Sequence, residues 1–435
     1  MITILNPSQE TWPTILQRPT QTVKDIEATV SEIFSEIEKK GDRAVAKYTQ
    51  LFDGVTIDTL QVSEDELNSA EITSVLKDAI QLAKNNISRF HGAQKTERIE
   101  LETMPGVACW QEKRPIQKVG LYIPGGTAPL FSTILMLAVP AQLAGCKEIV
   151  LCTPPDKNGK ISPAILYTAK LCGITKIFKV GGIQAIAAMT FGTESMPQVY
   201  KIFGPGNQFV TVAKQLATKY GVAIDMPAGP SELLVFADET AHAAFVASDL
   251  LSQAEHGADS QVVLVTTSTH LLEQVAAEVE TQLQVLPRKE IAAKAIKHSK
   301  LILMNTEEEA LQLINQYAPE HFSVVCKNEA YFVDNIQNAG SVFIGKYTPE
   351  SAGDYASGTN HTLPTNGYSK QYSGVNLDSF LKSMTFQKIS STGIQNIGPA
   401  IEHMANAEGL QAHKNAVTLR LDTLNNKSSF PAGRE

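Results

Sequence analysis

The chain has 435 residues, of which 43% are hydrophobic and 19% are charged, and its formal net charge is −8. This balance is typical of a globular protein with two or three domains. The charge includes no basic block, which argues against nucleic acid as a partner. The most apolar stretch, residues 128–144, is interrupted by prolines and does not predict a membrane span. Residues 1–7 lack the basic and apolar regions of a secretory signal, so we expect a cytoplasmic protein.

Five cysteines are present, and none forms a C-x-x-C pair. This odd number indicates neither a disulfide framework nor a thiolate zinc site. Cys152 and Cys326 lie in apolar runs and are predicted to pack in the core. Any bound metal would therefore use nitrogen and oxygen ligands.

The N-terminal region is predicted to be helical from about residue 21 to residue 89. Its apolar side chains recur at every third or fourth position, as at Ile26, Val30, Ile33 and Ile37. Gly41 breaks the first helix, and Ser63 followed by acidic residues 64–66 predicts the start of a later one. This region carries no candidate chemistry.

From residue 119 on, short apolar runs alternate with helical stretches such as residues 134–143. The first runs are residues 119–124, 148–153, 176–181, 201–203 and 233–237. Strands separated by helices predict βαβ units and a parallel sheet. Three runs end in glycine-rich turns at residues 124–126, 181–182 and 204–207. Ligands of doubly wound sheets bind at such turns, beyond the carboxyl ends of the strands.

The alternation then repeats, which predicts a second sheet of similar build. Its strands are expected at residues 261–266, 300–304, 321–326 and 341–344, and its helices at 271–283 and 307–316. A polar loop, residues 353–367, and an extended piece, residues 379–388, follow. The tail is predicted to be helical from about residue 396 to residue 424, with Gly409 as the residue after a helix end.

We therefore predict an α/β protein with two doubly wound parallel sheets, a helical N-terminal arm and a helical C-terminal tail. The expected regions are an arm at 1–114 that packs with the second sheet domain, a first α/β domain at 115–238, a second at 239–378 and a tail at 379–435. The tail has too many apolar positions for a free solvated segment, among them Leu410, Val417, Leu419, Leu421 and Leu424. It must bury them against its own sheets or against a partner chain.

The first candidate site is the stretch of residues 251–257, Leu-Ser-Gln-Ala-Glu-His-Gly. If residues 247–255 form a helix, Gln253 and His256 lie one above the other on one face. A carboxamide oxygen and an imidazole nitrogen aimed at one point can hold a metal, although for these two residues taken alone a solvated helix end is the favoured explanation. The pattern differs from the H-E-x-x-H of zinc proteases.

Further candidates lie downstream. Glu320 and His321 open a strand and supply two bases with intrinsic pKa values of roughly 4.3 and 6.5, unless they only meet water at a strand entry. Asp354 and His361 lie in the polar loop, and loops over a rigid sheet often carry functional residues. The alternative is an ordinary Asx-turn at Asp354 and a surface position for His361.

Near the C-terminus, the Gly409 break lets Glu408 and His413 approach one site. Together with Asp354, His256 and Gln253, His413 would provide two nitrogen and two oxygen ligands, a set that suits zinc or a similar divalent ion. His403 is expected to face solvent or to pack. No G-x-G-x-x-G is present, so a dinucleotide would bind without the usual phosphate fingerprint. These residues do not by themselves select a reaction.

Several ordered motifs closely resemble those of the histidinol dehydrogenase family, from the N-terminal helices to the tail. They are Val-Gly-Leu-Tyr-Ile-Pro-Gly-Gly from Val119, Gly-Pro-Gly-Asn from Gly204, Ala-Gly-Pro-Ser-Glu from Ala228, Ser-Gln-Ala-Glu-His-Gly from Ser252, Ala-Pro-Glu-His from Ala318, the loop from Gly353 and Glu-Gly-Leu-Gln-Ala-His from Glu408. The resemblance implies two incomplete Rossmann-like domains. It also implies oxidation of L-histidinol to L-histidine through bound L-histidinaldehyde, with two NAD⁺ used in turn, as the last step of histidine biosynthesis.

The resemblance also assigns residues. One zinc ion (Zn²⁺) per site falls to Gln253, His256, Asp354 and His413, which hold the substrate with it. His321 matches the general base and contacts the substrate, and Glu320 matches the residue that activates water. Substrate contacts match Ser231, His361 and Glu408, and NAD contacts match Tyr122, Gln184 and Asn207. The family resemblance further implies a homodimer in which the tail crosses over, so that His413 completes the partner's site.

Two other classes remain open on the residues alone. A zinc hydrolase could use the same metal with Glu320 activating water, and it would form no NADH. A two-lobed solute-binding protein would have similar α/β lobes, but it needs no Glu-His pair.

Overall fold

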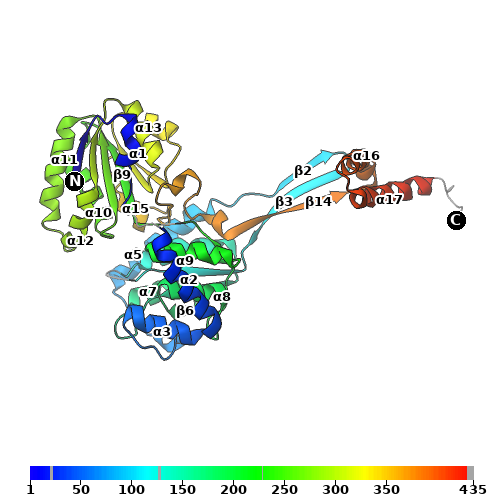
Figure 1. Cartoon of the computed structure of the whole chain (residues 1–435), viewed down its shortest axis with the longest axis horizontal. Helices are drawn as coiled ribbons and strands as arrows, with labels where there is room; N and C mark the ends of the chain where they lie inside the picture. Colours follow the sequence, from blue (N-terminus) through cyan, green and yellow to red (C-terminus); the bar gives the residue numbers. More distant parts are fainter. Residues whose placement is uncertain (20–22, 126–128, 228, 429–435) are drawn as a thin grey trace. The chain divides into compact units, whose positions relative to one another are not determined.

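The computed structural model describes residues 1–19, 23–125, 129–227 and 229–428 (Figure 1). Parts of three expectations, at residues 21–22, Gly126 and Ala228, lie outside the described residues. The chain divides into two units, residues 1–94 with 116–380 and residues 95–115 with the chain from 381 on. Among the described helices, none has the combination of length and apolarity that crossing a membrane requires.

The first unit contains two sheets in which every paired strand is parallel. One has the order β6-β5-β4-β7-β8, and the other has the order β1-β11-β10-β9-β12-β13. Counted along the chain from β4 or from β9, both follow the order 3-2-1-4-5 of a Rossmann-like fold without its sixth strand. The predicted fold class, two incomplete doubly wound sheets, is confirmed.

The strands of the first sheet are β4 Lys118–Tyr122, β5 Glu148–Thr153, β6 Lys176–Lys179, β7 Lys201–Phe203 and β8 Ala223–Ile224. Those of the second sheet are β1 Ile2–Leu5, β9 Glu232–Ala237, β10 Gln261–Thr266, β11 Lys300–Leu303, β12 His321–Val325 and β13 Ser341–Ile344. Every residue of β9, β10 and β12 is buried. Strands covered on both faces read as continuous apolar runs, which is why the sequence located them well.

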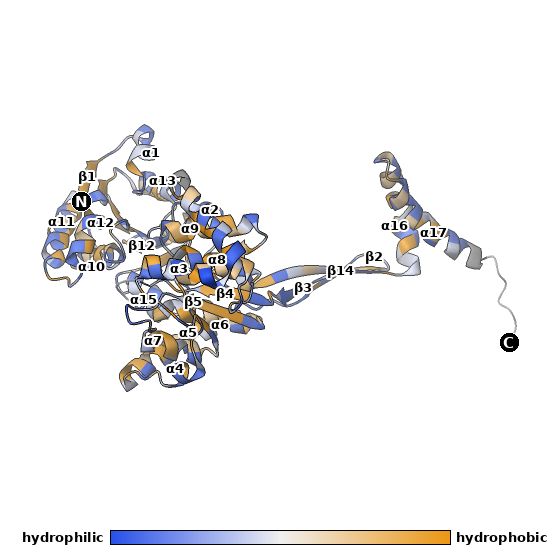
Figure 2. Cartoon of the chain, turned by 60° about the horizontal axis from the view of Figure 1, so that its bottom comes forward, coloured by the Kyte–Doolittle hydropathy of each residue, from blue (hydrophilic) through white to orange (hydrophobic). Residues whose placement is uncertain are grey.

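Helices cover both faces of each sheet. Those around the first sheet are α2 Val23–Lys40, α3 Asp42–Asp53, α4 Glu64–Asn68, α5 Ser74–Gly92, α6 Phe131–Ala144, α7 Pro163–Leu171, α8 Gly182–Phe191 and α9 Gln208–Lys219. Those around the second are α1 Trp12–Ile15, α10 Ala243–Ala254, α11 Thr269–Leu283, α12 Lys289–His298, α13 Glu307–Tyr317, α14 Glu329–Asn335 and α15 Glu350–Tyr355. The helix α6 is apolar on nearly every side and its residues 132–141 are all buried (Figure 2).

We predict that the N-terminal region forms one arm on the second sheet, and the structure differs. Among the described elements of this region, β1 pairs with that sheet, and α1 packs on it through residues such as Trp12. The apolar stripe of α2, including Val30 and Phe34, instead packs in one core with α8 and α9 of the first sheet. The predicted helix start at Ser63 is confirmed, because its side chain accepts a hydrogen bond from the Glu66 amide. A stripe of apolar residues predicts that a helix is buried, but it does not say against which sheet.

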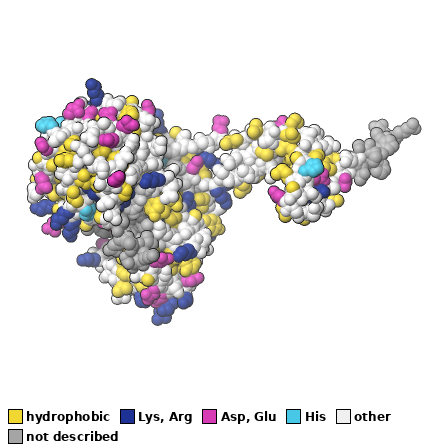
Figure 3. Space-filling view, turned by 45° about the horizontal axis from the view of Figure 1, so that its top comes forward, with side chains coloured by type: hydrophobic (Ala, Val, Ile, Leu, Met, Phe, Trp, Pro, Cys, Tyr) yellow, Lys and Arg dark blue, Asp and Glu magenta, His cyan; other side chains and the backbone are white. Residues whose placement is uncertain are grey.

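The second unit is built on a three-stranded antiparallel sheet in the order β14-β3-β2. Its elements are β2 Ile99–Met104, β3 Val107–Pro115, β14 Leu381–Ile389, α16 Ser391–Ala407 and α17 Gln411–Ser428. The unit therefore joins the end of the predicted arm to the tail. Gly409 has a φ of 73° directly after the α16 cap, as predicted. Large apolar side chains stay exposed on this unit, and Figure 3 shows hydrophobic side chains on its visible surface; they include Ile99, Leu101, Met384, Met404, Leu410 and Leu419.

Candidate active site

The candidate active site is a pocket of about 260 Å³ to which both sheets of the first unit contribute. The first sheet supplies the turns after β4 and β7, at its topological switch point, including Asn207. The second sheet supplies the opposite, amino ends of its strands: Ser231 precedes β9, and Glu320 and His321 open β12. The rule that ligands bind beyond carboxyl ends therefore describes only the first sheet.

Glu320 and His321 are buried side by side, and both bind the main chain of Glu232 at the start of β9. The Glu232 amide donates to Glu320 Oε2 at 2.8 Å, and the Glu232 carbonyl lies 3.0 Å from His321 Nδ1. With its proton on Nδ1, His321 keeps the lone pair of Nε2 free. This Nε2 atom is buried and has no hydrogen-bond partner in the described part of the chain.

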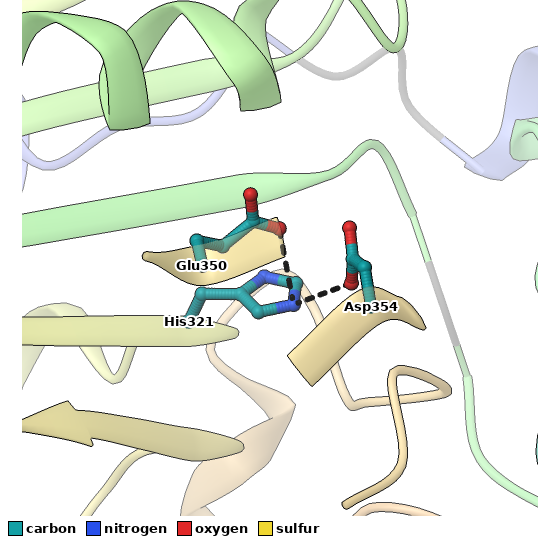
Figure 4. Close-up of side chains that lie close together, drawn as sticks. All are labelled: His321, Glu350 and Asp354. Carbon is teal, nitrogen blue, oxygen red and sulfur yellow. Dashed lines mark ion pairs between the residues drawn. The ribbon is translucent and has the colours of Figure 1, made fainter. Parts of the chain in front are cut away.

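Two carboxylates lie near the free nitrogen of His321. Nε2 is 3.7 Å from Glu350 Oε1 and 3.8 Å from Asp354 Oδ1, as the dashed lines of Figure 4 show. Both acids lie on α15, four residues apart and hence on one face. Ser252 Oγ donates to Glu350 Oε2 at 2.9 Å, whereas Glu350 Oε1 has no hydrogen-bond partner among the described residues.

Gln253 and His256 come from the end of α10, where we expected them. The helix ends at Ala254, so Gln253 lies in its last turn and His256 follows it. Gln253 is buried, and its Oε1 atom also lacks a hydrogen-bond partner among the described residues. His256 lines the pocket and is exposed, and desolvation by the surrounding protein lowers its pKa despite nearby Asp354.

His361 lies against Asp354, with its Nδ1 atom 3.8 Å from Asp354 Oδ1. Its Nδ1 is 2.9 Å from the Asp354 carbonyl oxygen, and its Nε2 is 3.0 Å from Thr133 Oγ1 on α6. Burial lowers the pKa of His361 although Asp354 opposes this effect. His361 thus connects the loop after α15 to the first sheet, and the pocket is lined from both halves of the unit.

The charges of the pocket fit a bound cation. Burial would lower the pKa of His321, but the carboxylates of Glu320, Glu350 and Asp354 outweigh burial and raise it to about 10. Burial, together with Asp354, raises the pKa of Glu350 to about 8, whereas the imidazoles of His361 and His321 lower that of Asp354 against burial. Ligand atoms of His321, Glu350 and Asp354 all lie within 4.8 Å of one another. A cluster of buried carboxylates and unpartnered polar atoms is able to hold a divalent metal ion.

A second pocket of about 840 Å³ shares Asn207 with the first and lies at the carboxyl ends of β4, β5 and β6. It contains the three residues assigned to the cofactor. The Tyr122 hydroxyl accepts from the Gly182 amide at 3.1 Å, and Gln184 Nε2 donates to Asp53 Oδ2 at 3.3 Å. Asn207 caps α9 by accepting from the Val210 amide.

A close-lying turn and a helix amino end adjoin this second pocket. Gly204 has a φ of 140°, and a Cβ atom there would lie 2.2 Å from the Tyr122 carbonyl oxygen. The turn therefore lies close against β4, and only glycine is compatible with that approach. It presents the amino end of the 12-residue helix α9 toward the pocket.

Sequence reasoning missed Glu350 and Asp53. Glu350 follows Pro349 and precedes Asp354 by four residues, a spacing that would have indicated a shared helix face had α15 been expected instead of a loop. Asp53 ends α3, and burial raises its pKa to about 6. No local pattern marks it, because it reaches the pocket only through the packing of α3 on the first sheet.

Two predicted site residues, Glu408 and His413, belong to the second unit. They flank the turn between α16 and α17, and both are exposed. The pocket of the first unit is therefore built without them.

Comparisons with known proteins identify the family. The model of the histidinol dehydrogenase family matches residues 16–421. The chain belongs to this family. A histidinol dehydrogenase of Bacteroides thetaiotaomicron is 60% identical over 96% of this chain and 98% of its own length. One of Vibrio vulnificus is 52% identical over 95% and 96% of the two chains. The crystal structure of the histidinol dehydrogenase of Elizabethkingia anophelis, 56% identical, superposes with a TM-score of 0.95 over 98% of this chain and 99% of that one. This chain is thus an enzyme, an oxidoreductase.

Proposed function

We propose that this chain oxidises L-histidinol to L-histidine through bound L-histidinaldehyde, with two NAD⁺ used in turn, in the cytoplasm. The observation that carries the proposal is a pair of buried atoms without hydrogen-bond partners among the described residues, Gln253 Oε1 and His321 Nε2, in one pocket of a histidinol dehydrogenase family member. A third such atom, Glu350 Oε1, lies 3.7 Å from His321 Nε2. Such atoms are costly to bury unless a ligand meets them.

In the first step neutral His321 removes the hydroxyl proton of the alcohol. The surrounding carboxylates raise the pKa of His321 to about 10, so the neutral form requires that a bound cation offset their charge. The Glu232 carbonyl fixes the proton of His321 on Nδ1, so that Nε2 is the atom that accepts the substrate proton. As the proton leaves, the carbon loses a hydride, which NAD⁺ accepts from the adjoining pocket. The nearby carboxylates Glu350 and Asp354 stabilise the imidazolium that results.

The second step needs water, because a hydride leaves only from a tetrahedral carbon. Glu320 takes a proton from the attacking water, and its Oε2 is oriented by the Glu232 amide. Burial raises the pKa of Glu320, which makes its carboxylate a stronger base than an exposed one. Retaining the aldehyde between the steps couples the unfavourable oxidation of the alcohol to the favourable oxidation of the aldehyde hydrate.

Zinc would be held by Gln253, His256 and Asp354 of one chain and by His413 of a second copy. When bound, it anchors the substrate nitrogens and offsets the negative charge of the pocket. Ser231, His361 and Glu408 complete the substrate contacts in this proposal, and Tyr122, Gln184 and Asn207 those of NAD⁺. The exposed apolar side chains of the second unit support a homodimer, because a surface of that kind is usually covered.

The two alternative classes have no comparable support. A zinc hydrolase and a solute-binding protein are both at variance with membership in an oxidoreductase family.

Replacing His256 by Ala should remove metal and activity together. The loss of NADH formation from L-histidinol should exceed about 100-fold, the upper range for changes in the second sphere of metal sites. Metal analysis of the purified variant, beside an activity assay, checks this. His403→Ala is the matched control, because His403 is exposed on α16 and should keep both. Full metal occupancy in His256→Ala would remove His256 from the ligand set.

A further inference from the structure

Both bases of the proposed mechanism are held by Glu232, which is not among the residues that line the pocket. The amide of Glu232 binds Glu320 Oε2 at 2.8 Å, and its carbonyl binds His321 Nδ1 at 3.0 Å. A shift of Glu232 would therefore move or release the two bases together. The placement of Glu232 itself then decides the geometry of the site.

The side chain of Glu232 is fixed by an ion pair from outside both sheets. Its carboxylate is 2% exposed and accepts two hydrogen bonds from Arg18, Nε to Oε1 at 2.5 Å and Nη2 to Oε2 at 2.9 Å. The amide of Asn366, in the loop that follows His361, donates to the same Oε1 at 2.8 Å. A bidentate guanidinium–carboxylate pair defines orientation as well as distance.

Arg18 also binds the entry to the neighbouring strand. Its Nη2 donates to the Tyr317 carbonyl at 2.8 Å, and its guanidinium lies 4.1 Å from the centre of the Tyr317 ring. Tyr317 ends α13, and Ala318, with a φ of 55°, then turns the chain into Glu320 and β12. One guanidinium thus ties together the start of β9 and the turn that precedes β12.

We propose that Arg18 and Glu232 are positioning residues that set the two bases, Glu320 and His321, relative to the substrate. The proposal rests on the proposed function, which gives these bases their roles. This buried, bidentate pair includes the first residue of β9 and binds the Tyr317 carbonyl before β12, so its geometry is transmitted directly to the reacting groups.

Arg18→Met keeps much of the apolar part of the side chain but removes the guanidinium group that binds Glu232. It should lower kcat for both L-histidinol and L-histidinaldehyde by about 10- to 100-fold, the cost of losing a partner that orients a catalytic group. KM for NAD⁺ and the metal content should not change, because Arg18 touches neither the cofactor pocket nor a ligand. Arg18→Lys should recover part of kcat, since it keeps the charge without the bidentate geometry. Glu232→Gln should resemble Arg18→Met, and the double variant should be no worse than either single one.

Lys179→Met is the matched control, because it breaks another partly buried ion pair, with Glu66 at 2.7 Å. It should lower the melting temperature without changing kcat. If the Arg18 and Glu232 variants behave like this control, with lower melting temperature and unchanged kcat while folded, the pair is only structural and the inference is wrong. Should Arg18→Met not fold, Arg18→Lys and Glu232→Gln decide between the same two outcomes. Glu320→Gln and His321→Asn are assayed in parallel: if they too keep full kcat, it is the proposed function that fails.

Discussion

Glu320→Gln is expected to slow the oxidation of L-histidinaldehyde by about 10²- to 10⁴-fold, the usual contribution of a general base, and to slow that of L-histidinol far less. Only the aldehyde step needs water to be activated. His321→Asn is expected to slow both steps, because the variant lacks the Nε2 base. NADH formation measured separately from each substrate tests the two expectations.

Glu273→Gln, an exposed change of the same kind on α11, should leave both rates unchanged. If Glu320→Gln slows the two half-reactions by the same factor, the division of labour between the two bases is wrong. Gln keeps an oxygen that can accept the hydrogen bond of the Glu232 amide, so the variant tests the loss of the base and not the loss of this hydrogen bond.

Co-refolding two inactive variants should restore activity if the tail crosses between copies. His321→Asn damages the pocket of its own first unit, and His413→Ala damages the site that its tail completes. A mixed dimer then holds one site with both lesions and one with none. Random pairing predicts a return of about one quarter of wild-type activity, because half of the dimers are mixed and each has one intact site.

Co-refolding His321→Asn with His256→Ala is the control. Both lesions lie in first units, so each site of that mixed dimer keeps one, and no activity should return. If His321→Asn with His413→Ala also stays inactive although mixed dimers are demonstrated, His413 does not complete the site of a partner.

The sequence predicted the parallel sheets well because their strands are buried on both faces. Continuous apolar runs such as that of β10 leave little choice of structure. The assignment of α2 to a sheet failed because an amphipathic helix specifies burial and not its partner. The long strand β3 was missed because its mixed residues are only partly buried, and its pairing with β14 joins segments far apart in the chain.

At the site, the residues that short motifs carry were found, and those that tertiary packing supplies were not. Gln253, Glu320, His321 and Asp354 lie in local patterns, and the structure brings all four to one pocket. Arg18 binds Glu232, which holds both bases, from a position far away in the sequence. No local spacing of residues could have revealed this contact.

The most direct test of the account is the number of NADH molecules formed for each L-histidinol consumed. The purified enzyme with limiting L-histidinol and excess NAD⁺ should form two NADH and one L-histidine, and a chelator should abolish the reaction. One NADH with free aldehyde released, or no NADH at all, would contradict the proposed four-electron oxidation.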